Sequence, residues 1–250
     1  MHARAVAIIP ARYASTRLPG KALASLDGRP MIRHVAERTR LARSVARVIV
    51  ATDDERIARA VDGTGAEVAM TRADHPTGTD RLAEVARDLE ADVVVNVQGD
   101  LPLLDPAMVD ALVDRMAAEP ALPMATLAVP IRDDAEWRSP HVVKVVCDER
   151  GRALYFSRSP IPHHRDGAPA DAPLGWRHVG MYAYRRAVLL ELAALAPTPL
   201  ERAERLEQLR ALEHGIAIGV EPWHGTEPII EVDVDEDLER ARAALGGRTT

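Results

Sequence analysis

The chain has 250 residues, of which 47% are hydrophobic and 28% charged, and its formal net charge is −6. This composition is typical of a globular protein with a substantial core, built as one domain or as one domain with a subsidiary lobe. The acidic charge and an aromatic content of only 3% argue against nucleic acid as a partner. With no apolar stretch near the roughly 20 residues that span a bilayer and with Cys147 as the single cysteine, we expect a cytoplasmic protein without a membrane partner.

The first hundred residues alternate between short apolar runs and segments with helical periodicity. Strands are predicted at 5–9, 45–52, 67–70 and 92–97, and helices at 31–42, from 53 onward and at 81–89. This alternation is typical of a parallel sheet with helices on both faces, in which ligands bind beyond the carboxyl ends of the strands. The two most polar loops at strand ends, 11–21 and 98–100, are therefore the first candidates for a functional site.

The middle of the chain is richer in predicted strands and contains an irregular, proline-rich segment at 159–174. Strands are predicted at 124–130, 142–147, 177–184 and 229–232, and helices at 202–214 and 236–245. We expect a Rossmann-like, mostly parallel α/β fold with an inserted, more β-rich lobe. The nucleotide-binding part would comprise about 1–120 and 215–250, and the inserted lobe about 121–214.

Three cationic side chains, Arg12, Arg17 and Lys21, lie in a glycine-containing loop directly after the first predicted strand. Backbone N–H groups, two guanidinium groups and an ammonium group can together bind a polyphosphate. The spacing is not that of a Walker A loop. A solvated basic loop is the alternative.

Two aspartates, Asp100 and Asp233, each follow a predicted apolar strand. Carboxylates at the carboxyl ends of strands can share a Mg²⁺ ion, which prefers oxygen ligands and phosphate oxygens. For each aspartate taken alone, a turn or a helix cap is the alternative. Asp235 is the obvious rival of Asp233.

Residues 9–21, with the sequence IPARYASTRLPGK, closely resemble the N-terminal signature of the CMP-Kdo synthetases, the 3-deoxy-manno-octulosonate cytidylyltransferases. Further matches follow in the same order at 50–53 (VATD), 70–75 (MTRADH), 77–81 (TGTDR), 96–100 (NVQGD), 124–127 (MATL), 143–146 (VKVV), 153–158 (ALYFSR), 178–182 (HVGMY), 206–210 (LEQLR) and 232–233 (VD). The resemblance covers almost the whole chain and is more specific than any single motif. It implies the fold of the nucleotide-diphospho-sugar transferases.

The resemblance implies a CTP site in the first part of the chain. The residues that it assigns to the nucleotide are Ala11, Arg12, Lys21, Met70, Thr71, Arg72, Thr77, Gly78, Thr79 and Gln98. Asp100, Lys21 and Arg12 would be catalytic, and Asp100 and Asp233 would bind Mg²⁺. For Met70 and Thr79, plain packing remains an open alternative.

The resemblance also implies a pocket for an acidic eight-carbon sugar, and a homodimer. The residues that it assigns to the sugar are Gln98, Arg158, His178, Tyr182, Glu207 and Gln208. An arginine suits the sugar carboxylate because its guanidinium can bind a carboxylate through two parallel hydrogen bonds. His178 could equally be a structural histidine.

The activity implied is transfer of CMP from CTP to the anomeric hydroxyl of Kdo, with release of pyrophosphate, for lipopolysaccharide or a related glycan. The chain departs from the family pattern at Leu101, where a Glu or Gln is usual, and at Val234-Asp235, where the family has Thr-Pro. The departure at Leu101 leaves other acceptors open, namely an amino-substituted Kdo, a sialic-acid-like sugar, or a sugar 1-phosphate with another nucleotide. A non-catalytic nucleotide-binding module is the alternative from another class.

Overall fold

The protein, seen in a computed structural model that describes residues 4–14, 18–167 and 170–246, contains two compact units. One consists of Met1–Asp114 with Gly225–Thr250, and the other is Arg115–His224. The sequence placed the corresponding divisions near 120 and 215. Because the second unit extends to His224, it contains the strand β11 (Ile218–Pro222), which the sequence had assigned to the nucleotide-binding part.

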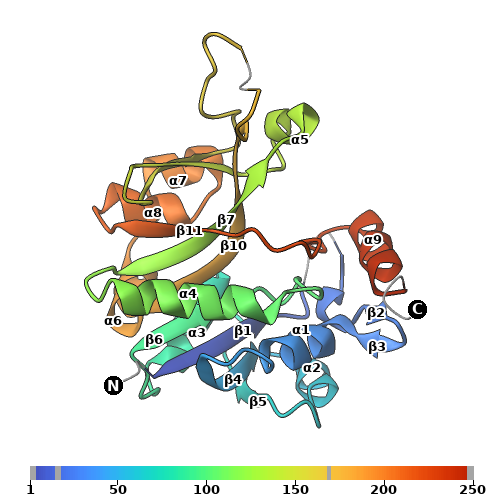
Figure 1. The fold of residues 1–250 in the computed structure, drawn as a ribbon. Coiled ribbons are helices and arrows are strands. Elements are labelled where there is room, and N and C mark those ends of the chain that lie inside the picture. Colours follow the sequence, from blue (N-terminus) through green and yellow to red (C-terminus); the bar gives the residue numbers. More distant parts are fainter. Residues whose placement is uncertain (1–3, 15–17, 168–169, 247–250) are drawn as a thin grey trace. The chain divides into compact units, whose positions relative to one another are not determined.

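Four parallel strands form the sheet of the first unit (Figure 1). In spatial order they are β6 (Val93–Asn96), β1 (Ala5–Ala11), β4 (Val45–Thr52) and β5 (Glu67–Met70). β1 and β6 are apolar and almost fully buried, as is usual for parallel strands that are covered on both faces. Ala11 lies beside Thr52, and Thr52 beside Met70. The carboxyl ends of three strands thus meet at one edge of the sheet.

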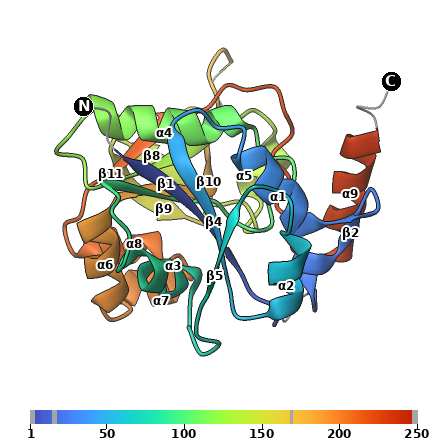
Figure 2. The ribbon, with the colours of Figure 1, turned by 90° about the horizontal axis from the view of Figure 1, so that it is seen from below.

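Three helices connect these strands and a fourth follows the last of them. They are α1 (Met31–Thr39), α2 (Glu55–Ala60), α3 (Gly78–Ala86) and α4 (Pro106–Ala118), the last of which contains the boundary between the units. The Asp54 side chain caps α2 by accepting from the Arg56 N–H, and Thr77 and Asp80 form a reciprocal capping box at α3. Figure 2 shows α3 on the opposite side of β1 and β4 from the beginning of α4. The sheet is therefore covered on both faces.

The C-terminal helix α9 (Asp235–Gly246) returns to the N-terminal part of the chain, where it packs beside the hairpin of β2 (Ser25–Leu26) and β3 (Arg29–Pro30) (Figure 1). A buried apolar cluster joins them, made of Leu26, Met31, Val232, Leu238 and Ala241. The Arg242 guanidinium also donates to the Ser25 carbonyl oxygen at 2.8 Å. This docking brings residue 233 to the region of the first loop.

The second unit is dominated by antiparallel strands. In spatial order they are β11, β7 (Met124–Ile131), β10 (Gly175–Arg185), β8 (Lys144–Cys147) and β9 (Ala153–Ser157), and among these only the β7–β11 pair is parallel. Its helices are α5 (Asp134–Arg138), α6 (Arg186–Ala194), α7 (Pro199–Glu204) and α8 (Gln208–Glu213). The expected fold class, an α/β protein with a parallel sheet and a more β-rich part, is confirmed.

Two predicted elements were wrong. The single helix expected at 202–214 is two short helices, α7 and α8, because Arg205 between them has a left-handed φ of 54°. The strand expected at 229–232 is extended chain that lies outside any sheet, although the Val232 N–H donates to the Asp100 carbonyl oxygen at 2.9 Å. The pattern of apolar residues could not reveal either difference, because it records neither a left-handed φ at a single residue nor whether a segment finds a strand to pair with.

Several boundaries also differ from the prediction. The helix expected at 81–89 begins at Gly78, where the capping box fixes its first turn. The helices α4 and α6 and the strands β9 and β11 had not been predicted. Along the part of the chain that the structure describes, none of the helices has the length and hydropathy needed to cross a bilayer.

Candidate active site

A pocket of about 280 Å³ opens at the carboxyl edge of the first unit's sheet. Its walls come from the end of β1, the start of the first 3₁₀ helix, the segment that enters α3, the loop after β6 and the segment before α9. The lining residues are Pro10, Ala11, Arg12, Lys21, Ala22, Met31, His75, Thr77, Gly78, Arg81, Gln98, Gly99, Asp100 and Asp233. Cationic and anionic side chains thus gather in one small volume.

The backbone conformation at Gly20 directs Lys21 toward this pocket. Gly20 has a φ of 70°, and its N–H donates to the Tyr13 carbonyl oxygen at 3.2 Å, which joins the two ends of the basic loop. A Cβ at Gly20 would be strained by the positive φ and would lie 3.3 Å from the Tyr13 ring. The 3₁₀ helix η1 (Lys21–Leu23) begins directly afterwards. Arg12, at the other end of the loop, is exposed and lines the same pocket, whereas Arg17 lies outside the described residues.

The Lys21 ammonium joins the two predicted metal ligands. Its Nζ lies 2.7 Å from Asp100 Oδ2 and 3.1 Å from Asp233 Oδ1. Burial acts to lower the pKa of Lys21, but the charges and hydrogen bonds of Asp100 and Asp233 outweigh burial and raise it above its ordinary value. Two carboxylates that are 133 positions apart in the sequence therefore reach one cation.

Asp233 reaches the pocket because the segment before α9 is fixed on both sides. Val232 is fully buried, and its N–H donates to the main chain of Asp100. On the other side, the Asp237 carboxylate accepts from the N–H groups of Asp233 at 2.9 Å and Val234 at 3.1 Å. Asp235, the rival candidate, is exposed and is absent from the pocket lining. The geometry thus places Asp233, the residue that the family resemblance favours, and not Asp235, in the pocket lining.

The loop after β6 passes so close to β1 that it needs a glycine. A Cβ on Gly99 would lie 2.9 Å from the Pro10 carbonyl oxygen, and a backbone atom cannot move aside cheaply. This close approach sets Gln98 and Asp100 against the end of β1. Leu101, the departure from the family pattern, is only 2% exposed and does not line the pocket. Its side chain is part of the core.

The segment after β5 forms another wall of the pocket. Its Thr71 N–H donates to the Thr52 carbonyl oxygen at 2.8 Å, which continues the pairing of β5 with β4. Thr77 and Gly78 line the pocket, whereas Thr79 is buried. Met70 is 54% exposed.

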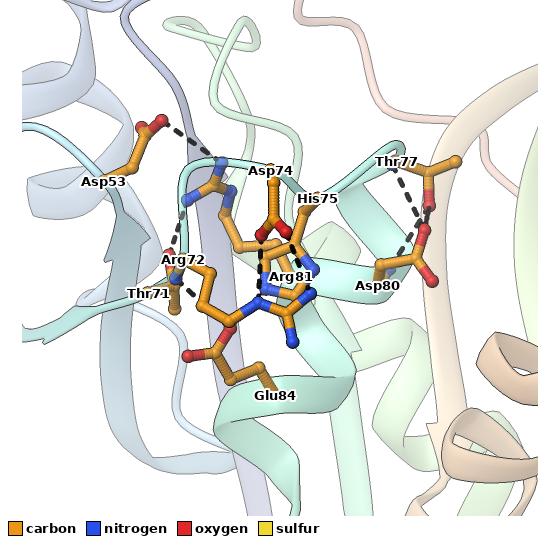
Figure 3. Close-up of polar contacts among 9 residues, drawn as sticks. All are labelled: Asp53, Thr71, Arg72, Asp74, His75, Thr77, Asp80, Arg81 and Glu84. Atoms are coloured by element: carbon orange, nitrogen blue, oxygen red, sulfur yellow. Dashed lines mark hydrogen bonds and ion pairs between the residues drawn. The ribbon is translucent and has the colours of Figure 1, made fainter.

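Two charged side chains of α3 meet this segment (Figure 3). The Arg81 guanidinium is 2% exposed; it donates to Thr71 Oγ1 at 2.5 Å and lies 3.6 Å from Asp53 Oδ2. Glu84 is hydrogen-bonded to His75 Nε2 and accepts from the Arg72 N–H at 3.3 Å. The Arg72 side chain itself forms an exposed ion pair with Asp74 at 2.9 Å.

In the second unit, the Arg158 side chain binds main-chain oxygens. Its Nε donates to the Glu204 carbonyl oxygen at 2.9 Å, and its Nη1 donates to the Pro140 carbonyl oxygen at 3.0 Å. Arg158 therefore ties the end of α7 to the loop before β8. The sequence had not predicted this structural role.

His178 and Tyr182 flank an irregularity of β10, where its register against β7 shifts between Val179 and Tyr182. The Thr126 hydroxyl lies 3.0 Å from His178 Nε2 and donates to the Met181 carbonyl oxygen at 2.7 Å. Burial lowers the pKa of His178 to about 3, so the imidazole is neutral at physiological pH. Its ring also lies 5.3 Å from that of Tyr182. A neutral histidine of this kind can donate or accept a hydrogen bond, but it contributes no positive charge.

Glu207 and Gln208 lie at the start of α8. Gln208 is 7% exposed, and its Nε2 finds no hydrogen-bond partner among the described residues. A buried amide donor without a partner is costly. It is therefore a candidate contact for a polar ligand.

Comparisons with known proteins agree over most of the chain. The cytidylyltransferase family model matches residues 6–218. The 3-deoxy-manno-octulosonate cytidylyltransferase of Syntrophotalea carbinolica is 54% identical over 247 residues, which cover 96% of this chain and 98% of the relative. The enzyme of the same name from Geobacter sulfurreducens is also 54% identical, over 96% of this chain and 98% of its own.

The chain belongs to the 3-deoxy-manno-octulosonate cytidylyltransferase family.

A solved structure of a CMP:2-keto-3-deoxy-manno-octonic acid synthetase complexed with CTP superimposes on this chain with a TM-score of 0.91. The two are 48% identical, and the match covers 98% of this chain and 99% of the other.

For this cytidylyltransferase, the structure brings most of the predicted nucleotide and metal residues of the first unit around one pocket. Those that line it are Ala11, Arg12, Lys21, Thr77, Gly78, Gln98, Asp100 and Asp233. Met70, Thr71, Arg72 and Thr79 lie outside the lining, and Thr79 is buried. The predicted sugar residues other than Gln98 all belong to the second unit.

Two pocket residues of the cytidylyltransferase, His75 and Arg81, were missed as site candidates. Both lie inside the motifs at 70–75 and 77–81 that carried the resemblance. The sequence did offer a signal for Arg81. It stands among the residues that α3 buries, next to Leu82, and a buried arginine needs an anionic or polar partner.

Proposed function

We propose that this chain transfers CMP from CTP to the anomeric hydroxyl of 3-deoxy-D-manno-octulosonate. The observation that carries the proposal is the contact of Lys21 with both Asp100 and Asp233 at the edge of the parallel sheet. The family supports it, since relatives with 54% identity bear the name of this reaction.

In the proposed reaction, the anomeric hydroxyl oxygen attacks the α-phosphorus of CTP. The new O–P bond forms as the bond from that phosphorus to the oxygen of the β-phosphate breaks, and pyrophosphate leaves with the electron pair while the hydroxyl proton passes to solvent. Lys21 and Arg12 bind the β- and γ-phosphates and offset the charge that develops on them. Cys147 is an unsuitable nucleophile, because burial raises the pKa of its thiol to about 11.

Asp100 and Asp233 fit a magnesium ion. The Asp100 Oδ2 and Asp233 Oδ1 atoms lie 2.7 Å and 3.1 Å from the same Lys21 nitrogen, so one cation can contact both carboxylates. Mg²⁺ is commonly bound by one or two carboxylates together with water and substrate phosphates. Once Lys21 turns to the phosphates, the two carboxylates lose their counter-ion. A bound Mg²⁺ would then supply the positive charge that polarises the reacting groups.

For the acceptor, we propose a site in the second unit built from His178, Tyr182, Glu207, Gln208 and Arg158. The unpartnered Gln208 Nε2 supports it as a donor to the sugar. Because His178 is neutral, Arg158 is the positively charged member of this set that could bind the sugar carboxylate. Burial of Leu101 in the core removes the main reason to prefer another acceptor.

The test is turnover of CTP with a panel of acidic sugars in the presence of Mg²⁺, followed by pyrophosphate release. Kdo should support the highest rate, and UTP or ATP should replace CTP poorly. Binding of CTP without turnover of any acceptor would instead favour the non-catalytic module. A higher rate with a sialic-acid-like sugar would reassign the acceptor.

We further propose that the enzyme works in the cytoplasm as a homodimer. β9 forms its ladder with β8 alone among the described strands, and its Leu154 is 63% exposed. An edge strand with an exposed apolar side chain is suited to contact with a second copy. Light scattering after size exclusion should give a dimer, and Leu154→Lys should weaken it.

A further inference from the structure

The wall of the nucleotide pocket formed by residues 71–77 carries few apolar anchors of its own. Arg72, Asp74 and Gly78 are exposed, and the segment has no regular secondary structure between β5 and α3. Yet His75, Thr77 and Gly78 line the pocket. Something must fix this segment if the pocket is to have a defined shape.

Side chains from the first two turns of α3 provide this support (Figure 3). Asp80 closes the capping box with Thr77, accepting from its hydroxyl at 2.7 Å. Arg81 binds Thr71 Oγ1, and its own charge is balanced by Asp53. Glu84, one turn beyond Asp80, binds both His75 and the main chain of Arg72. The segment is thus held near its beginning, its middle and its end by one helix.

Glu84 is the support with the clearest separate role. Its carboxylate joins a pocket-lining side chain, His75, to the main chain three residues earlier, at Arg72. Burial acts to raise the pKa of Glu84, but the hydrogen bonds from His75 and from the Arg72 N–H outweigh burial and keep the pKa below its ordinary value. The carboxylate is therefore ionised at neutral pH and accepts both hydrogen bonds. Glu84 itself does not line the pocket.

We propose that Glu84 is a positioning residue for nucleotide recognition: it holds the 72–75 wall in the shape that fits the cytidine moiety, and it acts through His75 and the Arg72 main chain. This inference rests on the proposed function, in which CTP occupies the pocket. It makes Glu84 a determinant of nucleotide affinity and selectivity, with no part in the chemical step.

The experiment compares Glu84→Ala and Glu84→Gln with a matched control, Glu55→Ala. Glu55 is a helical glutamate of α2 whose side chain is 81% exposed and whose ion-pair distance to Arg59 is 3.9 Å. Initial rates of pyrophosphate release are measured with varied CTP and varied UTP at saturating Kdo. Calorimetric titration with CTP alone and the melting temperature are recorded for each variant.

Glu84→Ala should raise the KM for CTP and the Kd of CTP by about tenfold, the scale for losing hydrogen bonds to a charged group. Its kcat should stay within about twofold of wild type by the same reasoning, and the CTP:UTP ratio of kcat/KM should fall. Glu84→Gln keeps an oxygen acceptor for the Arg72 N–H and should recover part of the loss. Glu55→Ala should match the wild type.

Unchanged KM, Kd and CTP:UTP ratio in Glu84→Ala would overturn the proposal. A fall in kcat with unchanged KM would also overturn it, because it would assign the His75–Glu84 pair to proton transfer. If Glu84→Ala does not fold, Glu84→Gln decides by the same KM and selectivity criteria. Failure of the proposed function would be distinct, because the wild type would then release no pyrophosphate from CTP and Kdo.

Discussion

Lys21 and Lys144 are the only lysines of the chain, one in each unit, and they lie in opposite electrostatic surroundings. The Lys21 ammonium lies between the carboxylates of Asp100 and Asp233, whose combined effect exceeds that of burial and raises its pKa. Lys144 is fully buried and donates to three main-chain carbonyl oxygens at 2.6 to 2.8 Å. Burial lowers its pKa.

Under the proposed function, this difference separates a functional cation, Lys21, from a structural one, Lys144. Another cation can replace an ammonium between two carboxylates and neutralise their charge. The ammonium can then bind an anionic ligand. An ammonium whose three protons are all given to main-chain carbonyls fixes the loop before β8 against the end of β9. The chain has arginines at all its other permanently cationic positions, and both of these sites hold a compact ammonium, whose shape a planar guanidinium does not reproduce.

The largest expected effect comes from removing one carboxylate beside Lys21. Asp100→Asn should lower kcat by about 100-fold or more, the scale for losing a main electrostatic element of the transition state. The melting temperature should change little. Asp114→Asn, a substitution of an exposed aspartate of α4, is the matched control. Near-normal turnover of Asp100→Asn would contradict the proposed role of the Asp100 carboxylate in the reaction.

Lys144→Met tests whether the Lys144 ammonium has a structural role. It would leave the carbonyl oxygens of Ser139, Val142 and Arg158 without their donor. We expect a loss of about 3 kcal/mol in the free energy of unfolding, the scale of hydrogen bonds to a charged group. The melting temperature should fall by roughly 10 °C. The Kd of CTP, measured by calorimetry below the transition, should be unaffected; a large change in that Kd would contradict a purely structural role.

Lys21→Met tests whether the Lys21 ammonium binds the phosphates of CTP. Loss of the ammonium should lower kcat/KM for CTP by about 30-fold, since charge-assisted hydrogen bonds to phosphate are worth about 2 kcal/mol. Lys21→Arg should recover only part of this, because a guanidinium cannot occupy the same position between two carboxylates. Initial rates with varied CTP measure the effect, and full activity of Lys21→Met would remove Lys21 from the phosphate site.

The smallest expected effect is a pair of opposite pH dependences. Because the folded pKa of Lys21 is raised, its stabilising contribution is complete below the unfolded pKa and is lost as the pH rises through the folded pKa. The folded pKa of Lys144 is lowered, so its contribution increases as the pH rises from that value to the unfolded pKa. Urea unfolding between about pH 8 and pH 12 should show the two trends as differences between wild type and each Met variant, at up to about 1.4 kcal/mol per pH unit. If the difference in the free energy of unfolding changed with pH at the same slope for both variants, the pKa shifts of Lys21 and Lys144 would not be opposite in sign.

Much of the fold could be read from the sequence because it depends on interactions between near neighbours. The alternation of apolar runs predicted β1, β4, β5 and β6 to within a few residues. The position of Asp100 at the end of an apolar strand indicated the active edge of the sheet. The pattern of apolar residues does not record helix caps or left-handed residues, which is why the start of α3 at Gly78 and the break at Arg205 were not predicted.

The sequence by itself thus determined the α/β architecture, the basic loop around Arg12 and Lys21, and, through family resemblance, the residues to examine. Only the tertiary structure decided that Asp233, 212 positions after Lys21, meets the same ammonium, and that Glu84 holds the pocket wall through His75. The physical reason is range: strand periodicity and helix caps arise from residues a few positions apart. The meeting of distant charges depends instead on how α9 packs on the N-terminal hairpin and how α3 packs on the sheet.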